Sequence, residues 1–213
     1  MDLFEAIESA GTCRFYKPDP LPDSVLSKAF DAARFGPQGG NRQPVRWVVV
    51  RDPAAKTQLK HWYLQPWGAY IANARKGAIS FGGASRMLDA ADHFANHLDE
   101  VPAIVVVCAE IASLHVTDPD FDRPSVVGGA SIYPSVQNFL LACRALGLGT
   151  ALTTLLCSFE PQVKELLSIP DGFLTAAHIA VGYPARPFLK KLKRQPVEGM
   201  VFAEKFGTPL LAK

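Results

Sequence analysis

The sequence predicts an α+β fold in which helices flank a short sheet. Predicted strands and helices alternate irregularly along the 213 residues, and no strand–helix–strand unit repeats. The run 103–109 is apolar throughout, which is typical of a strand covered on both faces. The segment 130–146 is apolar on more than one side, so a helix there is expected to be buried against several neighbours, a second copy of the chain among them.

The N-terminal part of the chain is predicted to hold two helices and one strand. Apolar residues at helical spacing predict a helix over 3–10. Three prolines keep 18–22 extended, and Asp23 is expected to cap a helix that runs to Ala33. The apolar run 46–51 is then predicted to be a strand.

The middle of the chain is predicted to be mainly helical. Asp52 and Pro53 are typical of a helix start, and a second helix over 85–98 has its apolar residues on one face. The segment 112–126 contains two prolines and is expected to be a loop. The long apolar helix follows, and Gly147 is expected to end it in the left-handed conformation.

The last third is predicted to contain two strands, one helix and a tail. The strands are expected over 151–156 and 175–181, and the helix over 160–167, with Pro170 ending it. The tail, residues 186–213, carries apolar residues that need a surface to cover. We expect it to wrap a partner subunit.

The composition argues against several classes of protein. Hydrophobic residues make up 48% and charged residues 20%, and no linker divides the chain, so residues 1–213 are expected to form one domain. The net charge of +2 is too small to indicate nucleic-acid binding, and no apolar run is long enough to span a membrane. The N-terminus lacks a signal-peptide pattern, so a cytoplasmic location is expected. The four cysteines form no CxxC pair and have no histidine at metal spacing, so no metal site is expected.

The segment 35–44 combines small residues with side-chain amides just before a predicted strand. Phosphate loops of the familiar kinds place their glycines after a strand and before a helix. Gly39 and Gly40 instead follow a helix, which excludes those loops. Asn41 and Gln43 are by default turn-stabilising residues. Arg14 is suited either to a bidentate phosphate contact or to a surface ion pair.

Taken together, an ordered set of motifs resembles the FMN-dependent nitroreductase family. The motifs are Thr12 to Pro18, Gly36 to Pro44, Gln137 to Ala142, Leu146 to Gly149, Leu166 to Pro170, Gly182 to Pro184 and Arg194 to Glu198. They span nearly the whole chain, and their order is more specific than any one of them.

The resemblance implies a three-layer sandwich with a short mixed or antiparallel sheet, and an intertwined homodimer with two FMN sites at its interface. Thr12 and Arg14, with Cys13 between them, would belong to the segment that holds the FMN phosphate, and Arg194 would join them. Thr154, Leu155 and Leu156 would lie along the isoalloxazine ring. Four residues of the partner subunit would approach the same flavin: Pro37, Gln38, Gly39 and Asn41.

Two departures from the family pattern affect this site. Family members usually carry a basic residue where this chain has Ala10 and Gly11, so one phosphate contact is missing or comes from elsewhere, such as Lys191 or Lys193. The family turn often has a serine where Gln38 stands, so a longer amide replaces a hydroxyl.

The resemblance also implies an oxidoreductase whose chemistry belongs to FMN, so no catalytic side chain is expected. NADH or NADPH would reduce the flavin, leave, and be replaced by a small-molecule electron acceptor such as a nitroaromatic or a quinone, in a ping-pong mechanism. Residues 60–98 are expected to form an insertion that covers the substrate. Its candidate lining residues are His61, Trp62, Tyr63, Trp67, Tyr70, Phe81, His93 and Phe94.

Other interpretations stay open at this point. Aromatic residues at helical spacing are more often part of the core than of a pocket. A reductive dehalogenase or a flavin-modifying enzyme would use the same scaffold with a dedicated lid. A non-catalytic FMN storage or sensor protein would bind the flavin without turnover. An interaction module of the same fold class would bind no flavin at all.

Overall fold

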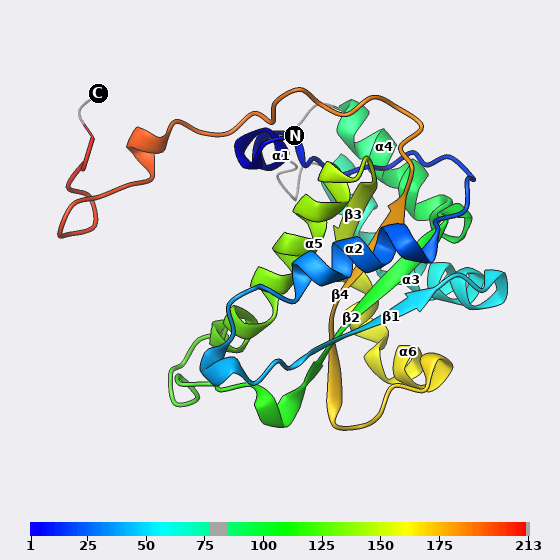
Figure 1. Cartoon of the computed structure of the whole chain (residues 1–213), viewed down its shortest axis with the longest axis horizontal. Coiled ribbons are helices and arrows are strands. Elements are labelled where there is room, and N and C mark those ends of the chain that lie inside the picture. The colour runs from blue at the N-terminus through cyan, green and yellow to red at the C-terminus, as the bar shows by residue number, and fades with distance from the viewer. Residues whose placement is uncertain (77–84, 212–213) are drawn as a thin grey trace.

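A computed structural model describes residues 1–76 and 85–211 of the chain (Figure 1). Four strands form one sheet: β1 (Val45–Val50), β2 (Ala103–Glu110), β3 (Gly149–Thr153) and β4 (Phe173–Gly182). The helices are α1 (Leu3–Ser9), α2 (Asp23–Ala33), α3 (Pro53–Arg75), α4 (Ser85–Asn96), α5 (Tyr133–Ala145) and α6 (Glu160–Leu167). Short 3-10 turns lie between them, at Gly39–Asn41, Leu98–Glu100, Ile111–Ser113, Val127–Ser131, Leu155–Phe159 and Val197–Gly199.

The sheet is antiparallel throughout, in the order β1-β2-β4-β3. Strand β2 lies in its centre and pairs with β1 on one side and β4 on the other, with a bulge between Val107 and Cys108. Because β2 is covered on both faces, all but its last residue are buried, as its apolar run predicts.

Two layers of helices cover the two faces of the sheet, so the predicted three-layer α+β sandwich is confirmed (Figure 1). Alternate residues of β2 point to opposite faces. Val105 and Val107 pack with residues of α2 and α5 such as Phe139, whereas Ile104 and Val106 pack in the cluster formed by α3, α4 and α6.

Most helix ends follow the local signals in the sequence. The Asp52 carboxylate accepts a 2.8 Å hydrogen bond from the Ala55 N–H and caps α3, with Pro53 at the first helical position. Gly147 ends the α5 region with φ of 79°, and the Leu148 N–H donates to the Cys143 carbonyl, which closes the helix end.

Four details of the predicted elements are wrong. Asp23 does not cap α2; it is the first helical residue, and its carboxylate pairs with Arg51 at 2.6 Å. The long helix begins at Tyr133 rather than 130, because 127–131 form a 3-10 turn. Strand β3 covers Gly149–Thr153 instead of 151–156, since its pairing with β4 begins at Gly182. Helix α6 has the predicted bounds, Glu160–Leu167, but Ser168 ends it in the left-handed conformation rather than Pro170.

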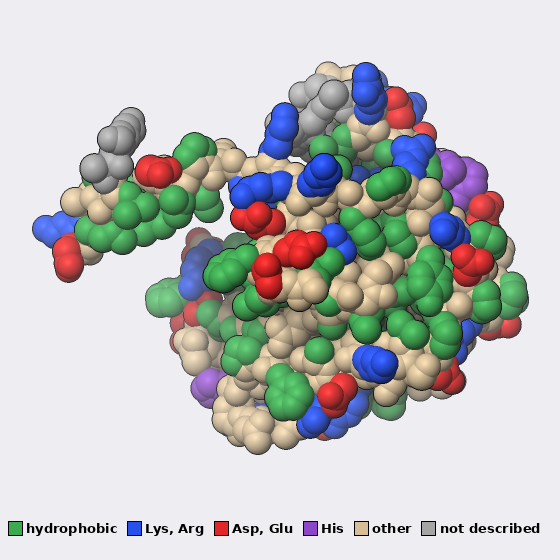
Figure 2. All heavy atoms as spheres, turned by 45° about the horizontal axis from the view of Figure 1, so that its top comes forward, with side chains coloured by type: hydrophobic (Ala, Val, Ile, Leu, Met, Phe, Trp, Pro, Cys, Tyr) green, Lys and Arg blue, Asp and Glu red, His purple; other side chains and the backbone are tan. Residues whose placement is uncertain are grey.

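The tail leaves the body of the molecule after crossing α1 (Figure 1). The Leu192 N–H donates a 2.7 Å hydrogen bond to the Glu8 carbonyl. Beyond that crossing, hydrophobic side chains line the projecting segment (Figure 2), and Phe206 is 95% and Met200 62% exposed. Among the described residues, no helix combines the length and apolar character needed to cross a bilayer.

Candidate cofactor site

The segment from Thr12 to Tyr16 lies along the outer edge of the sheet, beside β3. Thr12 forms a parallel bridge with Thr150, and the Cys13 N–H donates a 2.8 Å hydrogen bond to the Thr150 carbonyl. The approach is close because Gly149 has no side chain: a Cβ there would lie 2.6 Å from the Cys13 sulfur. The Tyr16 hydroxyl donates to the Cys13 carbonyl at 2.9 Å. The backbone that carries Arg14 is therefore fixed on both sides.

Next to this edge lies a cavity of about 330 Å³, here called the aromatic cavity. It is open to solvent on one side and is lined by Thr12, Arg14, Tyr63, Trp67, Tyr70, Ala91, Phe94, Ala151, Leu152, Thr153, Thr154 and Leu155. Helices α3 and α4 supply the aromatic wall, and the end of β3 supplies the floor. Such a combination of aromatic side chains with a few polar groups is typical of a site for a planar ligand.

The aromatic wall is a row on one face of α3. Tyr63, Trp67 and Tyr70 are spaced by four and three residues, so they lie above one another on the helix. The ring of Trp67 lies 6.1 Å from that of Tyr63 and 5.4 Å from that of Tyr70. Burial raises the pKa of Tyr63, while Thr153 and Arg14 act in the opposite direction. The phenol is therefore neutral at physiological pH.

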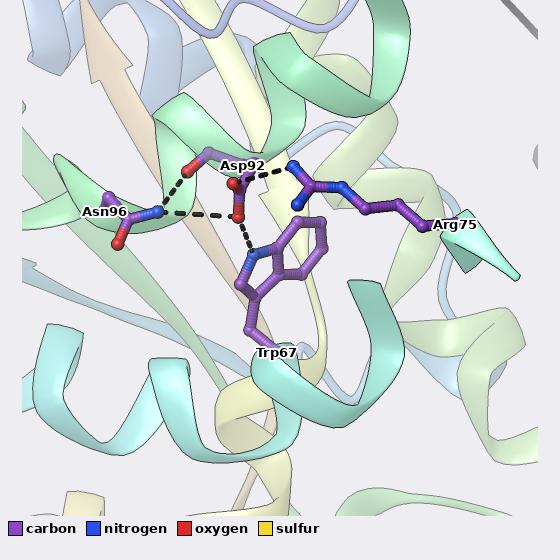
Figure 3. A network of polar contacts seen from close by, with 4 residues as sticks. All are labelled: Trp67, Arg75, Asp92 and Asn96. Atoms are coloured by element: carbon purple, nitrogen blue, oxygen red, sulfur yellow. Dashed lines mark hydrogen bonds and ion pairs between the residues drawn. The ribbon is translucent and has the colours of Figure 1, made fainter. Parts of the chain in front are cut away.

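Asp92 on α4 holds Trp67 in place (Figure 3). Its Oδ1 accepts a 2.8 Å hydrogen bond from the indole N–H, and its Oδ2 accepts one of 3.2 Å from Arg75. The side chain of Asn96, one turn further along α4, donates to the Asp92 carbonyl at 2.8 Å. These contacts join α3 and α4 on the side of the cavity where the wall is formed.

Arg14 is a partly buried cation without an acidic partner among the described residues. No ion pair or hydrogen bond of its guanidinium is found there. Burial lowers its pKa, and nearby Tyr63, Tyr16 and Cys13 act in the opposite direction. An arginine stays charged in proteins, so this guanidinium offers its N–H groups to an anion.

Thr12 and Arg14 also line a second, smaller cavity of about 200 Å³. We call it the arginine cavity because Arg14 and Arg186 both line it. Segment 184–189, at the start of the tail, forms its other wall. Cys13 lines it too, although its thiol donates to the Phe15 carbonyl at 3.3 Å, and burial raises the pKa of that thiol. The two cavities therefore adjoin at Thr12 and Arg14.

The turn 37–41 lies at the far end of α5 from Arg14. The Gly39 N–H donates to the Ser131 hydroxyl at 3.1 Å, and the Gln38 amide lies 3.4 Å from the Ser135 hydroxyl, at the start of α5. Arg14 lies beside β3, which follows the other end of that helix. Thirteen helical residues span about 20 Å. Within one chain, Pro37, Gln38, Gly39 and Asn41 therefore do not line either cavity.

The structure separates the remaining predicted site residues. Thr154 and Leu155 line the aromatic cavity, whereas Leu156 is fully buried in the core. Arg194 is exposed on the tail, where its guanidinium donates to the Lys193 carbonyl at 2.8 Å, and it lines neither cavity. Lys191 pairs with Glu8 at 2.7 Å.

The predicted covering region 60–98 contributes only part of its aromatic set to the cavity. Tyr63, Trp67, Tyr70 and Phe94 line it. Trp62 stacks on Phe159 instead, and His93 stacks on Phe15 and His97. Phe81 lies outside the described residues. Sequence reasoning missed Ala91 and Arg186, since nothing local marks a small helical residue or an arginine after Pro184 as part of a cavity.

The fold and the cavities define an α+β protein with room for a planar ligand beside an unpaired cation. The chain belongs to the nitroreductase family, whose family model matches residues 7–183. Membership in this family identifies the protein as an oxidoreductase. Among the described residues, no cluster of His, Cys, Asp or Glu is arranged to hold a metal ion.

Relatives and solved structures agree with this assignment. A protein of Thermus thermophilus named NADH dehydrogenase is 26% identical, with 87% of this chain and 88% of the relative covered. Iodotyrosine deiodinase 1 of Rattus norvegicus is 22% identical, over 92% of this chain and 67% of that protein. A BluB-like flavoprotein of Clostridium difficile has the same fold, with a TM-score of 0.70 at 20% identity, over 96% of this chain and all of that one.

Proposed function

We propose that the protein is an FMN-dependent oxidoreductase that uses NADH or NADPH to reduce a nitroaromatic, a quinone or a similar small acceptor. The observation that carries the proposal is Arg14, an unpaired, partly buried guanidinium between the aromatic cavity and the arginine cavity. FMN has a planar ring, which suits the aromatic cavity, and an anionic phosphate, which suits the arginine cavity. The NAD(P)H-linked names of the relatives support the choice of reductant.

The residues present fit FMN. Tyr63, Trp67 and Phe94 give the isoalloxazine ring apolar contact, and Thr154 and Leu155 lie at the floor where backbone amides would face its edge. Thr12 and Arg14 would hold the phosphate, since a hydroxyl and a guanidinium can donate several hydrogen bonds to it. When bound, FMN supplies hydride transfer in two half-reactions, one with NAD(P)H and one with the acceptor.

The side chains would position and stabilise rather than exchange protons. Arg14 would stabilise negative charge on the reduced cofactor, because a fixed cation in a partly dry site acts strongly on developing charge. The row of Tyr63, Trp67 and Tyr70 would exclude water from one side of the ring. No side chain is needed as a general base in this scheme.

We propose further that the active form is a homodimer. In one chain the turn 37–41 and Arg14 are about one helix length apart, so the turn would reach the cofactor of the partner subunit rather than its own. The exposed apolar side chains of the tail favour burial against a second copy.

The proposal is tested by spectroscopy and turnover. We expect the purified protein to be yellow or to become so with FMN, and to oxidise NADH or NADPH steadily when a quinone or nitroaromatic is added. Flavin binding without turnover would favour a storage or sensor protein. Protein that stays colourless with excess FMN would exclude the flavin proposal.

A second candidate function is reductive dehalogenation, since several relatives are named iodotyrosine deiodinases. Those relatives are 22 to 24% identical to this chain. Halide release from a halogenated phenol by the reduced, FMN-loaded protein would favour this candidate. Acceptor reduction without halide release would favour the quinone or nitroaromatic reaction.

A further inference from the structure

Among the described residues, the arginine cavity is lined by two cationic residues and no acidic one. Arg14 and Arg186 line it, and none of its described lining residues is an aspartate or a glutamate. Its other lining residues are mainly apolar. One of them, Phe188, has the Arg144 guanidinium 4.0 Å from its ring centroid, although Arg144 itself does not line the cavity. Two arginines thus line a space of about 200 Å³. The potential in this space favours an anionic ligand.

Neither lining arginine is neutralised within the described part of the chain. Four other arginines, at 34, 51, 75 and 123, form ion pairs of 2.6 to 3.2 Å with aspartates. Arg14 and Arg186 have no such partner there, and both line the same cavity. Arg14 is half-buried and Arg186 is exposed. An anion bound between the two like charges would relieve their mutual repulsion.

Arg186 is held in place by a stack of rings. Its guanidinium lies 3.4 Å from the centroid of the Phe15 ring, and that ring stacks on His93 at 4.6 Å. A stacked guanidinium uses its flat face for the ring and leaves its N–H edge free for an anion. The side chain is therefore oriented before any ligand binds.

The backbone places the two arginines on paired segments. The Ala185 N–H donates to the Phe15 carbonyl at 2.9 Å, and the Lys17 N–H donates to the Tyr183 carbonyl at 2.9 Å. An antiparallel bridge joins Tyr16 and Pro184 between them. Arg14 and Arg186 lie next to these contacts, so their spacing is set by the fold rather than by a mobile tail.

None of the basic residues further along the tail, at 190, 191, 193 and 194, lines the arginine cavity. Lys191 is paired with Glu8, and Arg194 donates to a neighbouring carbonyl. We propose that Arg186 is a phosphate ligand, which together with Arg14 and Thr12 binds the phosphate monoester of FMN in the arginine cavity. It would replace the basic residue that is missing at Ala10. This inference rests on the proposed flavin function.

The test compares two flavins that differ only in the phosphate. Flavin fluorescence quenching would give the affinities of FMN and riboflavin for the wild type, Arg186→Ala and Arg186→Lys. We expect Arg186→Ala to bind FMN about tenfold more weakly, because one charge-assisted contact is lost. Riboflavin affinity should not change. Arg186→Lys should recover part of the loss, because it keeps the charge without the planar fork.

Lys190→Ala is the matched control, because Lys190 is exposed, lies four residues away and lines neither cavity. It removes the same charge and should leave both affinities unchanged. Arg186→Ala should also reduce the salt dependence of FMN binding, whereas Lys190→Ala should not.

The outcomes separate this inference from the proposed function. Wild-type protein that binds neither flavin would overturn the proposed function and the role of Arg186 with it. Wild-type protein that binds FMN, with Arg186→Ala binding it equally well, would overturn only the role of Arg186. An equal loss of FMN and riboflavin affinity in Arg186→Ala would show that Arg186 supports the fold of the cavity and does not contact phosphate.

Discussion

The indole N–H of Trp67 donates a 2.8 Å hydrogen bond to the carboxylate of Asp92, and this contact ties α3 to α4 beside the aromatic cavity. Trp67 is almost fully buried, and removal of Asp92 would leave its N–H without this acceptor. The position of the widest aromatic side chain in the cavity thus depends on one carboxylate of the neighbouring helix.

Replacing Asp92 with alanine should destabilise the protein by about 2 kcal/mol, because a buried N–H loses a charged acceptor. Asp92→Asn keeps an acceptor and should cost about half as much. Urea unfolding measures both, and the emission of Trp67 should shift in Asp92→Ala as the ring loses its anchor. Asp89→Ala, an exposed change on the same helix, is the control. Equal stability of Asp92→Ala and Asp89→Ala would contradict the prediction.

Arg14→Ala should weaken FMN binding by tenfold or more, since a charge-assisted hydrogen bond to phosphate contributes about 1.5–3 kcal/mol. Isothermal titration or fluorescence quenching measures the change. Lys28→Ala removes a charge from the exposed side of α2 and should have no effect. Unchanged affinity in Arg14→Ala would remove this residue from the phosphate site.

The tail should stabilise the dimer. Replacing Met200 and Phe206 together with serine removes two exposed apolar side chains and should leave the folded monomer intact. If both are buried in the dimer, the dissociation constant should rise by tenfold or more, because full burial of each side chain is worth about 1.5–3 kcal/mol. Sedimentation at several concentrations measures it, with Leu166→Ser as the control. A wild type that sediments as a monomer while holding FMN would refute the shared site.

Gly36→Ala should destabilise the protein by about 1–3 kcal/mol, because overpacking forces the backbone to shift. A Cβ at Gly36 would lie 2.4 Å from the backbone nitrogen of Ser135, and backbone cannot move aside as a side chain can. Gly172 has no heavy atom within 4 Å of the corresponding position. Gly172→Ala should therefore leave the stability in thermal unfolding almost unchanged. An equal loss of stability in both variants would contradict the predicted steric clash at Gly36.

His178 should make the protein less stable in mild acid. It is fully buried in β4, opposite Thr153, and neither ring nitrogen has a hydrogen-bond partner among the described residues. Burial lowers its pKa from 6.5 to about 4, so between these values the unfolded chain binds the extra proton. The stabilising contribution is full above pH 6.5 and is lost as the pH falls towards 4.

From pH 7 to pH 5, this residue should reduce the free energy of unfolding by about 2 kcal/mol. Urea unfolding at the two pH values measures this loss of stability. His178→Leu should abolish the part of the loss that His178 causes. His61→Leu, at an exposed position on α3, is the control and should retain the full pH dependence. An identical pH dependence in wild type and His178→Leu would contradict the assignment.

Local patterns were sufficient for most of the fold. The apolar run of β2 predicts a covered strand, Asp52 and Pro53 predict the start of α3, and Gly147 predicts the end of α5. Each signal acts through the residue's own backbone or its nearest neighbours, so it can be read without the rest of the chain. The segment Thr12 to Arg14 was also predictable, because its motif is contiguous.

Only the tertiary structure decided which of these residues meet. The register of β3 depends on pairing with β4, which shifts the strand to Gly149–Thr153. The length of α5 separates the turn at Gly39 from Arg14. The pairing of segment 14–17 with 183–186 brings Arg186 beside Arg14, although the two are far apart in sequence. Cavities arise from such long-range contacts, since their walls come from segments whose spacing is set by hydrogen bonding and packing rather than by chain order.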